Sequence, residues 1–234
     1  RAKPARARYE PGMIEIRDLA FAYPAGGFQL RIPAFDLAEG ERLAVVGPSG
    51  SGKTTLLDLI SGIRLPSAGS LRVDGEEVSL MSDAARRAFR LRRIGFVFQD
   101  FELLDYLTIQ ENILYPYRIS NALKLDVATR ARARALAEAA GIGKQFGRHP
   151  NALSRGERQR AAICRSLITA PRLVLADEAT GALDPDNKLR VLDLLFERVA
   201  AEGAALLAVT HDTELLQRFD RVVDFRDYRI GAEP

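Results

Sequence analysis

The chain has 234 residues, 47% of them hydrophobic and 28% charged, so it can bury a sizeable core and global disorder is excluded. Its formal net charge of +3 is too small to indicate nucleic-acid binding by itself. The single cysteine, Cys164, excludes an internal disulfide framework, and no apolar run approaches the roughly 18–20 residues that span a bilayer, so we expect a soluble cytoplasmic protein.

Residues 1–12, RAKPARARYEPG, form a basic segment with two prolines and no apolar periodicity. We expect this segment to be a flexible extension, and residues 13–234 to form a single domain. From Met13 onward the sequence MIEIRDL alternates between apolar and polar residues, which predicts a half-buried strand.

Four short apolar runs predict the strands of a parallel sheet, because they lack the strict polar alternation of strands with one exposed face. They occupy residues 43–47, 94–99, 173–178 and 205–211. Helical patterns separate these runs, in TTLLDLISG, in RARARALAEAAG, from Ser154 onward, and in NKLRVLDLLFERVAAEG. The alternation of strand and helix predicts a doubly wound α/β sheet.

Polar residues follow each of the four runs directly: the loop from Gly47, then Gln99, Asp177 with Glu178, and His211. Ligands of open α/β sheets bind outside the carboxyl ends of the strands. We therefore expect these four strand ends to form one site.

The segment from Gly47 to Thr54, GPSGSGKT, matches the pattern G-x-x-x-x-G-K-[ST], with an apolar strand before it and a helix after it. Its glycines allow a backbone curl whose N–H groups point at phosphate oxygens, while Pro48 shapes the loop without donating. The start of the helix adds a partial positive charge. Lys53 is expected to reach the β- and γ-phosphates, and Thr54 to bind Mg²⁺.

Asp177 and Glu178 end a hydrophobic strand. An acidic pair at a strand end is a weak signal alone, but it becomes a strong one beside a phosphate loop. The aspartate is placed to bind Mg²⁺, and the glutamate to orient and deprotonate an attacking water.

Several further residues have both a functional and a structural interpretation. His211 could contact the γ-phosphate or lie on the surface, and Gln99 could bind Mg²⁺ or water or cap a turn. Tyr23, in FAYPAGG, reads first as part of a turn, and its ring could also stack on an adenine. Asp184 fits the N-cap of the next helix, with Pro185 at the first helical position.

The segment NALSRGERQR contains a capping box by spacing, with Ser154 at the N-cap and Glu157 three residues later. This box explains a helix start without any ligand. Arg155 then opposes the helix dipole at a cost of about 0.3–1 kcal/mol, which the cap, at about 1 kcal/mol, offsets. A bound anion would reverse that cost.

These motifs follow one another in the order and spacing of the ATPase domains of ABC transporters, and the chain resembles this family from Met13 onward. The resemblance implies a P-loop NTPase fold with a doubly wound, mainly parallel sheet and an N-terminal antiparallel β subdomain. It also implies an inserted helical subdomain, at about residues 100–168, that carries the signature motif. ATP and Mg²⁺ are the implied cofactors.

The resemblance also implies residue roles. Catalytic roles fall to Lys53, Gln99, Glu178 and His211, and Mg²⁺ binding to Thr54, Gln99 and Asp177. Nucleotide contacts fall to Tyr23 at the adenine, to the Walker A loop Gly47, Pro48, Ser49, Gly50, Ser51, Gly52, Lys53, Thr54 and Thr55, and to Gln99, Asp177, Ser154, Gly156, Glu157 and Asp184.

Domains of this family work as head-to-tail homodimers, with ATP of one subunit covered by the signature of the other. The resemblance therefore implies a homodimer, transmembrane permease subunits, a peripheral location on the cytoplasmic face of the inner membrane, and no nucleic acid. Residues 100–120 are expected either to receive a permease's cytoplasmic helices or to form core of the helical subdomain.

Within the family the chain looks most like the lipoprotein-release and macrolide-export group, through IGFVFQDFELLDYLTIQENI, ERQRAAICRSL and LADEATGALD. It departs from the usual pattern at Arg155, at Ala179 and at Gly181-Ala182. We expect Arg155 to lie along the dimer surface, adding positive charge without filling the phosphate's place.

Three alternatives stay open. The first is the ATPase of an ABC-type signalling or mechanotransmission complex, which acts in cell-wall remodelling or peptide sensing and not in transport. The second is a soluble ABC-type ATPase of DNA repair or translation, although the long coiled-coil insertion or tandem domains usual there are absent. The third is a degenerate module that binds ATP without hydrolysing it.

Overall fold

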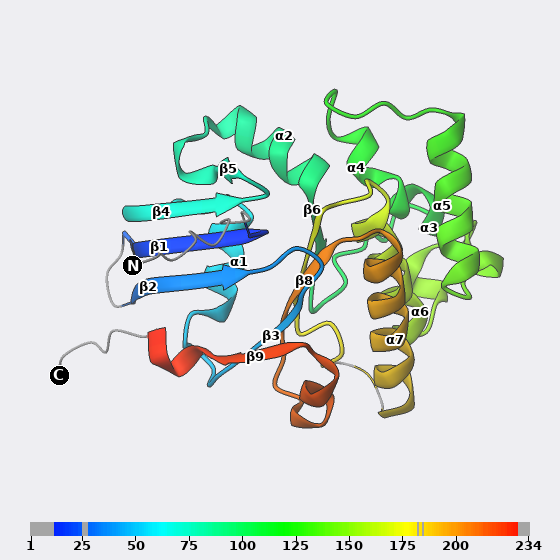
Figure 1. Cartoon of the computed structure of the whole chain (residues 1–234). Coiled ribbons are helices and arrows are strands. Elements are labelled where there is room, and N and C mark those ends of the chain that lie inside the picture. The colour runs from blue at the N-terminus through cyan, green and yellow to red at the C-terminus, as the bar shows by residue number, and fades with distance from the viewer. Residues whose placement is uncertain (1–11, 25–27, 182, 184, 229–234) are drawn as a thin grey trace, which may run out of the picture.

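The computed structural model describes residues 12–24, 28–181, 183 and 185–228. Two sheets form its framework (Figure 1). The antiparallel sheet has the order β2-β1-β4-β5, with β1 Ile14–Ala22, β2 Gln29–Leu37, β4 Ala68–Val73 and β5 Glu76–Glu77. The parallel sheet has the order β6-β7-β8-β3-β9, with β3 Arg42–Val46, β6 Ile94–Val97, β7 Leu173–Asp177, β8 Ala205–Val209 and β9 Arg221–Asp224.

Seven α-helices of the described residues accompany the sheets: α1 Lys53–Ile60, α2 Asp83–Arg93, α3 Ile109–Ile113, α4 Tyr115–Arg118, α5 Val127–Ala139, α6 Arg155–Leu167 and α7 Pro185–Ala201. Short 3-10 helices occupy Val78–Leu80, Gly143–Gln145, Pro150–Ala152, Thr213–Arg218 and Phe225–Tyr228. The antiparallel sheet lies to one side of the parallel sheet, and α3, α5, α6 and α7 lie to the other (Figure 1).

The two faces of the parallel sheet pack into two separate hydrophobic cores, because successive side chains of a strand point to opposite faces. One core joins Leu43, Val45, Leu173, Leu175, Leu207 and Val209 to α1 and the antiparallel sheet. The other joins Val97, Val174, Ala176, Leu206 and Ala208 to α3, α5, α6 and α7. Burying each of the Val and Leu side chains contributes about 1.5–3 kcal/mol, so packing on both faces stabilises the sheet that carries the strand ends.

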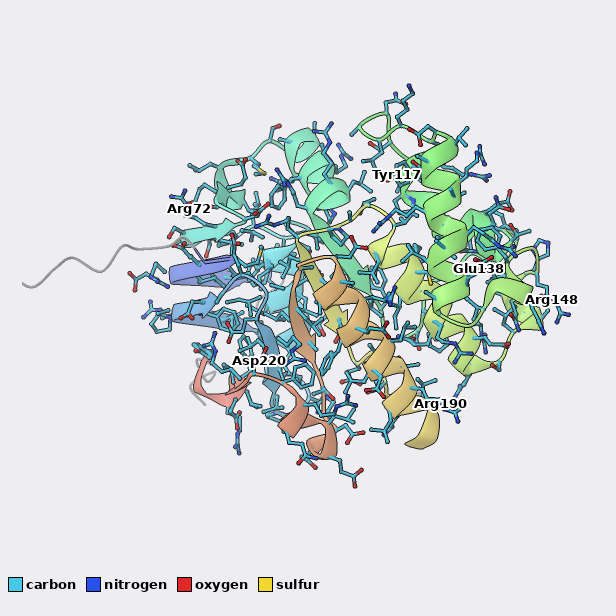
Figure 2. All side chains as sticks on the ribbon, turned by 45° about the vertical axis from the view of Figure 1, so that its right-hand side comes forward. Arg72, Tyr117, Glu138, Arg148, Arg190 and Asp220 are labelled. Atoms are coloured by element: carbon cyan, nitrogen blue, oxygen red, sulfur yellow. The ribbon has the colours of Figure 1, made fainter. Side chains whose placement is uncertain are left out.

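Helix α6 lies at the centre of the helical region, where it contacts α3, α5, α7 and β6. It approaches the sheet closely at Gly95 of β6, where a Cβ atom would lie 2.3 Å from the carbonyl oxygen of Ser166. Arg72 of β4 and Arg148, in the loop before α6, mark opposite ends of the molecule (Figure 2).

The structure confirms the predicted strands and helices, with ends that differ by a few residues. The four apolar runs are β3, β6, β7 and β8, all paired in parallel, and the alternating run from Met13 is β1. Residues 1–11 of the predicted extension lie outside the described residues. None of the helices in the described part of the chain combines the length and apolar character that a membrane span requires.

Candidate functional site

A cleft of about 330 Å³ lies at the carboxyl ends of the parallel strands. It is lined by residues from the loop after β3 and from the ends of β6, β7 and β8, which are neighbours in the sheet. The structure thus brings the four polar strand ends together, as the sequence predicted. The lining residues are Tyr23, Phe28, Ser49, Gly50, Gly52, Lys53, Thr54, Thr55, Gln99, Asp177, Glu178, Val209 and His211.

The glycine-rich loop connects β3 to α1, and its backbone needs residues without a side chain. Gly50 and Gly52 have left-handed φ angles of 75° and 99°. A Cβ at Gly52 would also lie 2.6 Å from the Phe28 ring. Helix α1 begins after Gly52 with no side-chain cap and no acidic residue in its first turn, so its first N–H groups are available to bind an anion.

Two polar side chains of this loop point to a ligand. The hydroxyl of Ser51 is buried and has no hydrogen-bond partner among the described residues. The ammonium of Lys53 donates to the carbonyl oxygens of Gly47 and Pro48 at 2.8 and 2.9 Å. Burial lowers the pKa of Lys53, and the charges of Glu178 and Asp177 oppose that shift. Since an ammonium has three donors, Lys53 keeps one for a bound oxygen.

Thr54 and Asp177 meet across the start of α1 and the end of β7. The threonine hydroxyl donates to Asp177 Oδ2 at 3.2 Å. Burial raises the pKa of Asp177, and the nearby charge of Glu178 raises it further, while the bond from Thr54 lowers it. A nearby cation would relieve this unfavourable burial of negative charge.

The described residues hold no group of three or more His, Cys, Asp or Glu side chains placed around a metal ion. Mg²⁺ commonly binds through one or two carboxylates together with substrate phosphates. Thr54, Asp177 and Gln99, which line one cleft, are therefore a donor set compatible with Mg²⁺.

Glu178 and His211 form a direct contact, with His211 Nε2 2.6 Å from Glu178 Oε1. Asp212, the sequence neighbour of His211, is paired with Lys188 of α7 at 2.8 Å. His211 therefore faces the acidic end of β7 and does not pair with Asp212. Both Glu178 and His211 also line an adjoining polar cleft of about 460 Å³.

The backbone of Glu178 is left-handed, with φ 46°, which is uncommon for a residue with a side chain. Its N–H donates to the Val209 carbonyl at 3.0 Å, and its own carbonyl accepts from the Gly181 N–H at 2.9 Å. These two bonds fix the conformation that turns the carboxylate toward His211.

Tyr23 lies at the edge of the cleft, where its hydroxyl is 3.1 Å from Thr55 Oγ1. Sequence reasoning missed two of its neighbours. Phe28 packs edge-on at 5.9 Å between ring centroids, and the Arg64 guanidinium lies over the Tyr23 ring at 4.6 Å. The contact of Phe28 with Tyr23 could have been predicted, since the two aromatic residues flank the β1–β2 connection. The contact of Arg64 with the Tyr23 ring could not, because it depends on tertiary packing.

The signature residues do not line this cleft. Ser154 and Glu157 form the predicted capping box at the start of α6, with Ser154 N–H donating to Glu157 Oε2 at 2.8 Å. Gly156 is buried in the first turn, and Arg155 is exposed at the first helical position. Helix α7 begins at Pro185, as predicted, whereas Asp184 lies outside the described residues.

A family model described as ABC transporter matches residues 30–181. The chain belongs to the ABC transporter family. It is 42% identical over 224 residues to the macrolide export ATP-binding/permease protein MacB 1/2 of Paracoccus denitrificans (strain Pd 1222). That alignment covers 94% of this chain and 33% of the relative, so the chain spans about a third of the length of the curated protein it matches.

Solved structures agree with this assignment. A dimeric post-hydrolysis state of the ATP-binding cassette MJ0796, bound to ADP and Pi, has a TM-score of 0.80 at 29% identity over 95% of this chain and all of its own. The structure of cbiO1 from Clostridium perfringens, part of the ABC transporter complex cbiONQ, has a TM-score of 0.82 at 26% identity, covering 92% of this chain and 85% of its own. The predicted P-loop fold, with antiparallel sheet and helical subdomain, is confirmed. The chain is an ATP-binding cassette of the ABC ATPase type, related to macrolide-export ATPases.

Proposed function

We propose that this cassette hydrolyses ATP and, as a head-to-tail pair with a second copy, powers a membrane permease. The observation that carries the proposal is the meeting of Lys53, Thr54, Asp177, Glu178 and His211 around one cleft. Two comparisons support it, since one relative is named as an ATP-binding/permease protein and one structural neighbour is a dimer with hydrolysis products. We further propose that the domain is peripheral on the cytoplasmic face of the inner membrane.

In this proposal the phosphates of ATP lie in the loop from Gly47 to Thr54. Backbone N–H groups and the start of α1 receive their charge, and Lys53 uses its remaining donor on the β- and γ-phosphates. The orphaned hydroxyl of Ser51 gains a partner. Tyr23, held by Thr55 and backed by Phe28, offers a ring on which the adenine stacks.

Mg²⁺ would be held by Thr54, Asp177 and Gln99, where it would supply Lewis-acid stabilisation of the phosphate charge. Glu178 is the general base that orients the attacking water and accepts its proton. His211, already 2.6 Å from that carboxylate, orients it and reaches the γ-phosphate. Lys53 stabilises charge that develops on the leaving phosphate.

The signature residues act in the second site of the pair. Ser154, Gly156 and Glu157 lie outside this chain's own cleft, so their contact with ATP requires the cleft of a partner copy. Arg155 is exposed at that helix start and adds positive charge to the proposed dimer surface.

A largely apolar groove of about 310 Å³ between α2, β6, α4 and α6 fits the proposed permease contact. Its lining includes Phe96, Phe98 and Ile119, with Arg90, Arg165 and Glu102 at the charged positions. We propose that it receives a short cytoplasmic helix of the permease with an apolar face and acidic flanks, which the arginines complement.

Residues 100–120 were expected either to contact a permease or to form core of the helical subdomain, and individual residues of this region fit one or the other. Phe101, Ile109 and Ile113 are buried in the protein. Tyr106 and Ile119, at 74% and 53% exposed, are available to a partner. We therefore assign to the permease only the exposed members of this region.

The proposal is tested by the turnover of Glu178→Gln. Removing the general base should lower ATP hydrolysis by about 10²–10⁴-fold, while ATP still binds. Glu138→Gln is the matched control, since Glu138 lies exposed on α5 and pairs with Arg134 at 2.7 Å, away from the cleft (Figure 2). Hydrolysis by Glu178→Gln at the parental rate would refute the assignment of Glu178 as the base.

A further inference from the structure

The segment that follows β6 has an unusual backbone. Phe101 and Glu102 are consecutive residues with left-handed φ angles of 65° and 49°. Each such conformation costs about 1–3 kcal/mol for a residue with a side chain and persists only when its surroundings fix it. Gln99, which lines the nucleotide cleft, lies two residues before this pair.

Arg165, in the last turn of α6, supplies that fixation. Its guanidinium donates to the carbonyl of Phe101 at 2.6 Å and, through its other terminal nitrogen, to the carbonyl of Glu102. Burial lowers the pKa of Arg165 to about 10, so the guanidinium stays charged at neutral pH. A planar, forked donor is suited to holding two neighbouring carbonyls, whereas a lysine ammonium is not.

A second arginine of α6 holds the same segment. The Arg158 guanidinium lies over the Phe101 ring at 5.5 Å. Arg158 and Arg165 are seven positions apart and so share one face of the helix. Two arginines of helix α6 therefore contact the segment 99–102, Arg158 at the Phe101 ring and Arg165 at the carbonyls of Phe101 and Glu102.

The chain beyond this segment is fixed by a different helix. Asn112 of α3 is fully buried, accepts from the Leu104 N–H at 2.7 Å, and donates to the carbonyls of Leu104 and Leu107 at 3.0 and 3.1 Å. Residues 104–107 are thereby anchored to α3. Within the turn, the Phe101 N–H donates to the Phe98 carbonyl at 3.2 Å and the Glu102 N–H donates to the Asp100 carbonyl at 2.7 Å. The position of Gln99 therefore depends on β6 before it, on this turn, and on the contacts that α6 makes with Phe101 and Glu102.

We propose that Arg165 is a positioning residue for ATP hydrolysis, which holds Gln99 at the nucleotide cleft by fixing the carbonyls of Phe101 and Glu102. This inference rests on the proposed function, in which Gln99 binds Mg²⁺ and water. Arg165 also lines the apolar groove together with Glu102, so one side chain contacts both the proposed permease site and the segment that follows Gln99.

The test is a double-mutant cycle in the full chain between Arg165→Lys and Gln99→Ala, with the unfolding temperature measured for each variant. Arg165→Lys should lower kcat at saturating Mg–ATP by about tenfold, since small displacements of catalytic groups are costly. ATP affinity measured in EDTA should change less than about twofold, because the phosphate loop is untouched. In the Gln99→Ala background the further loss of kcat should be less than about twofold.

Arg132→Lys is the matched control. Arg132 of α5 also donates to two neighbouring carbonyls, those of Leu167 and Ile168 at 3.0 and 3.1 Å, but away from the cleft. It should lower the unfolding temperature and leave kcat unchanged. Should Arg165→Lys fail to fold, Arg158→Gln replaces it, with a smaller loss of kcat that also disappears in the Gln99→Ala background.

If Arg165→Lys lowers kcat by the same factor in the parental and the Gln99→Ala backgrounds, the inference is overturned while the proposed function stays intact. A loss confined to unfolding temperature, as in Arg132→Lys, would overturn it in the same way. If Gln99→Ala alone leaves kcat unchanged, the role of Gln99 in the proposed function fails, and this inference fails with it.

Discussion

Glu178 stores backbone strain at the position where the proposed chemistry takes place. Its left-handed φ of 46° costs about 1–3 kcal/mol, and its carboxylate contacts His211 at 2.6 Å. Strain of this kind persists where the surrounding structure over-determines a residue. Here the bonds to Val209 and Gly181 do so, which fits a carboxylate pre-oriented for one task.

Glu157 gives the molecule a pH-dependent contribution at the start of α6. The backbone N–H of Ser154 donates to its carboxylate, which holds the pKa of Glu157 below its ordinary value of 4.5. Because the pKa of Glu157 is lower in the folded protein than in the unfolded chain, its carboxylate stabilises the fold above pH 4.5. This contribution to the free energy of unfolding is lost as the pH falls through the pKa that Glu157 has in the folded protein.

We therefore expect the free energy of unfolding of the parent, relative to Glu157→Gln, to be constant near neutral pH and to fall as the pH drops below 4.5. The glutamine keeps the geometry of the capping box but does not titrate. Denaturant unfolding at a series of pH values measures this difference. A difference that does not change with pH would show that the carboxylate charge adds nothing to the cap.

Residues that belong to motifs could be predicted from the sequence, and residues that reach a site through the fold could not. Lys53, Asp177 and His211 follow buried strands, so their convergence follows from the topology of parallel sheets. Arg64 is distant in sequence from Tyr23, and Arg165 is distant from Gln99, so only tertiary packing brings these arginines to the Tyr23 ring and to the segment after Gln99.

At the scale of secondary structure, β6 and α6 approach each other closely at Gly95. A Cβ on Gly95 would lie 2.3 Å from the Ser166 carbonyl oxygen, which is closer than van der Waals contact allows. Gly95→Ala should therefore push strand and helix apart at a cost of about 1–3 kcal/mol.

Gly147→Ala is the matched control for this prediction, since a Cβ there would meet nothing within 4 Å and its φ is not left-handed. The midpoint of denaturant unfolding should fall for Gly95→Ala and stay near the parental value for Gly147→Ala. Equal midpoints for Gly95→Ala and the parent would contradict the close approach of β6 to α6.

The sequence pattern identified the most completely buried strands but missed several other elements, among them β2, although Leu30, Ile32, Phe35 and Leu37 are buried there. The runs that became β7 and β8 are almost wholly buried, and they were predicted correctly. Helix α2, DAARRAFRLRR, buries only Phe89 and was not predicted. Strand β9 is short and partly exposed, and its place at the sheet edge depends on pairing with β3.

For the whole molecule, the nucleotide cleft and the signature residues lie apart in one chain. The cleft gathers the loop after β3 and the ends of β6, β7 and β8, whereas Ser154 and Gly156 start a helix that does not line it. A head-to-tail pair would bring each signature to the other copy's cleft. The central claim is therefore that ATP joins two copies and that hydrolysis separates them.

The most direct measurement is the sedimentation of Glu178→Gln with Mg–ATP, with ADP and without nucleotide. Because this variant binds ATP but should not hydrolyse it, we expect a dimer with Mg–ATP and monomers in the other two conditions. Lys53→Ala, which weakens phosphate binding, should stay monomeric throughout. A Glu178→Gln protein that is saturated with ATP yet remains a monomer would contradict the claim.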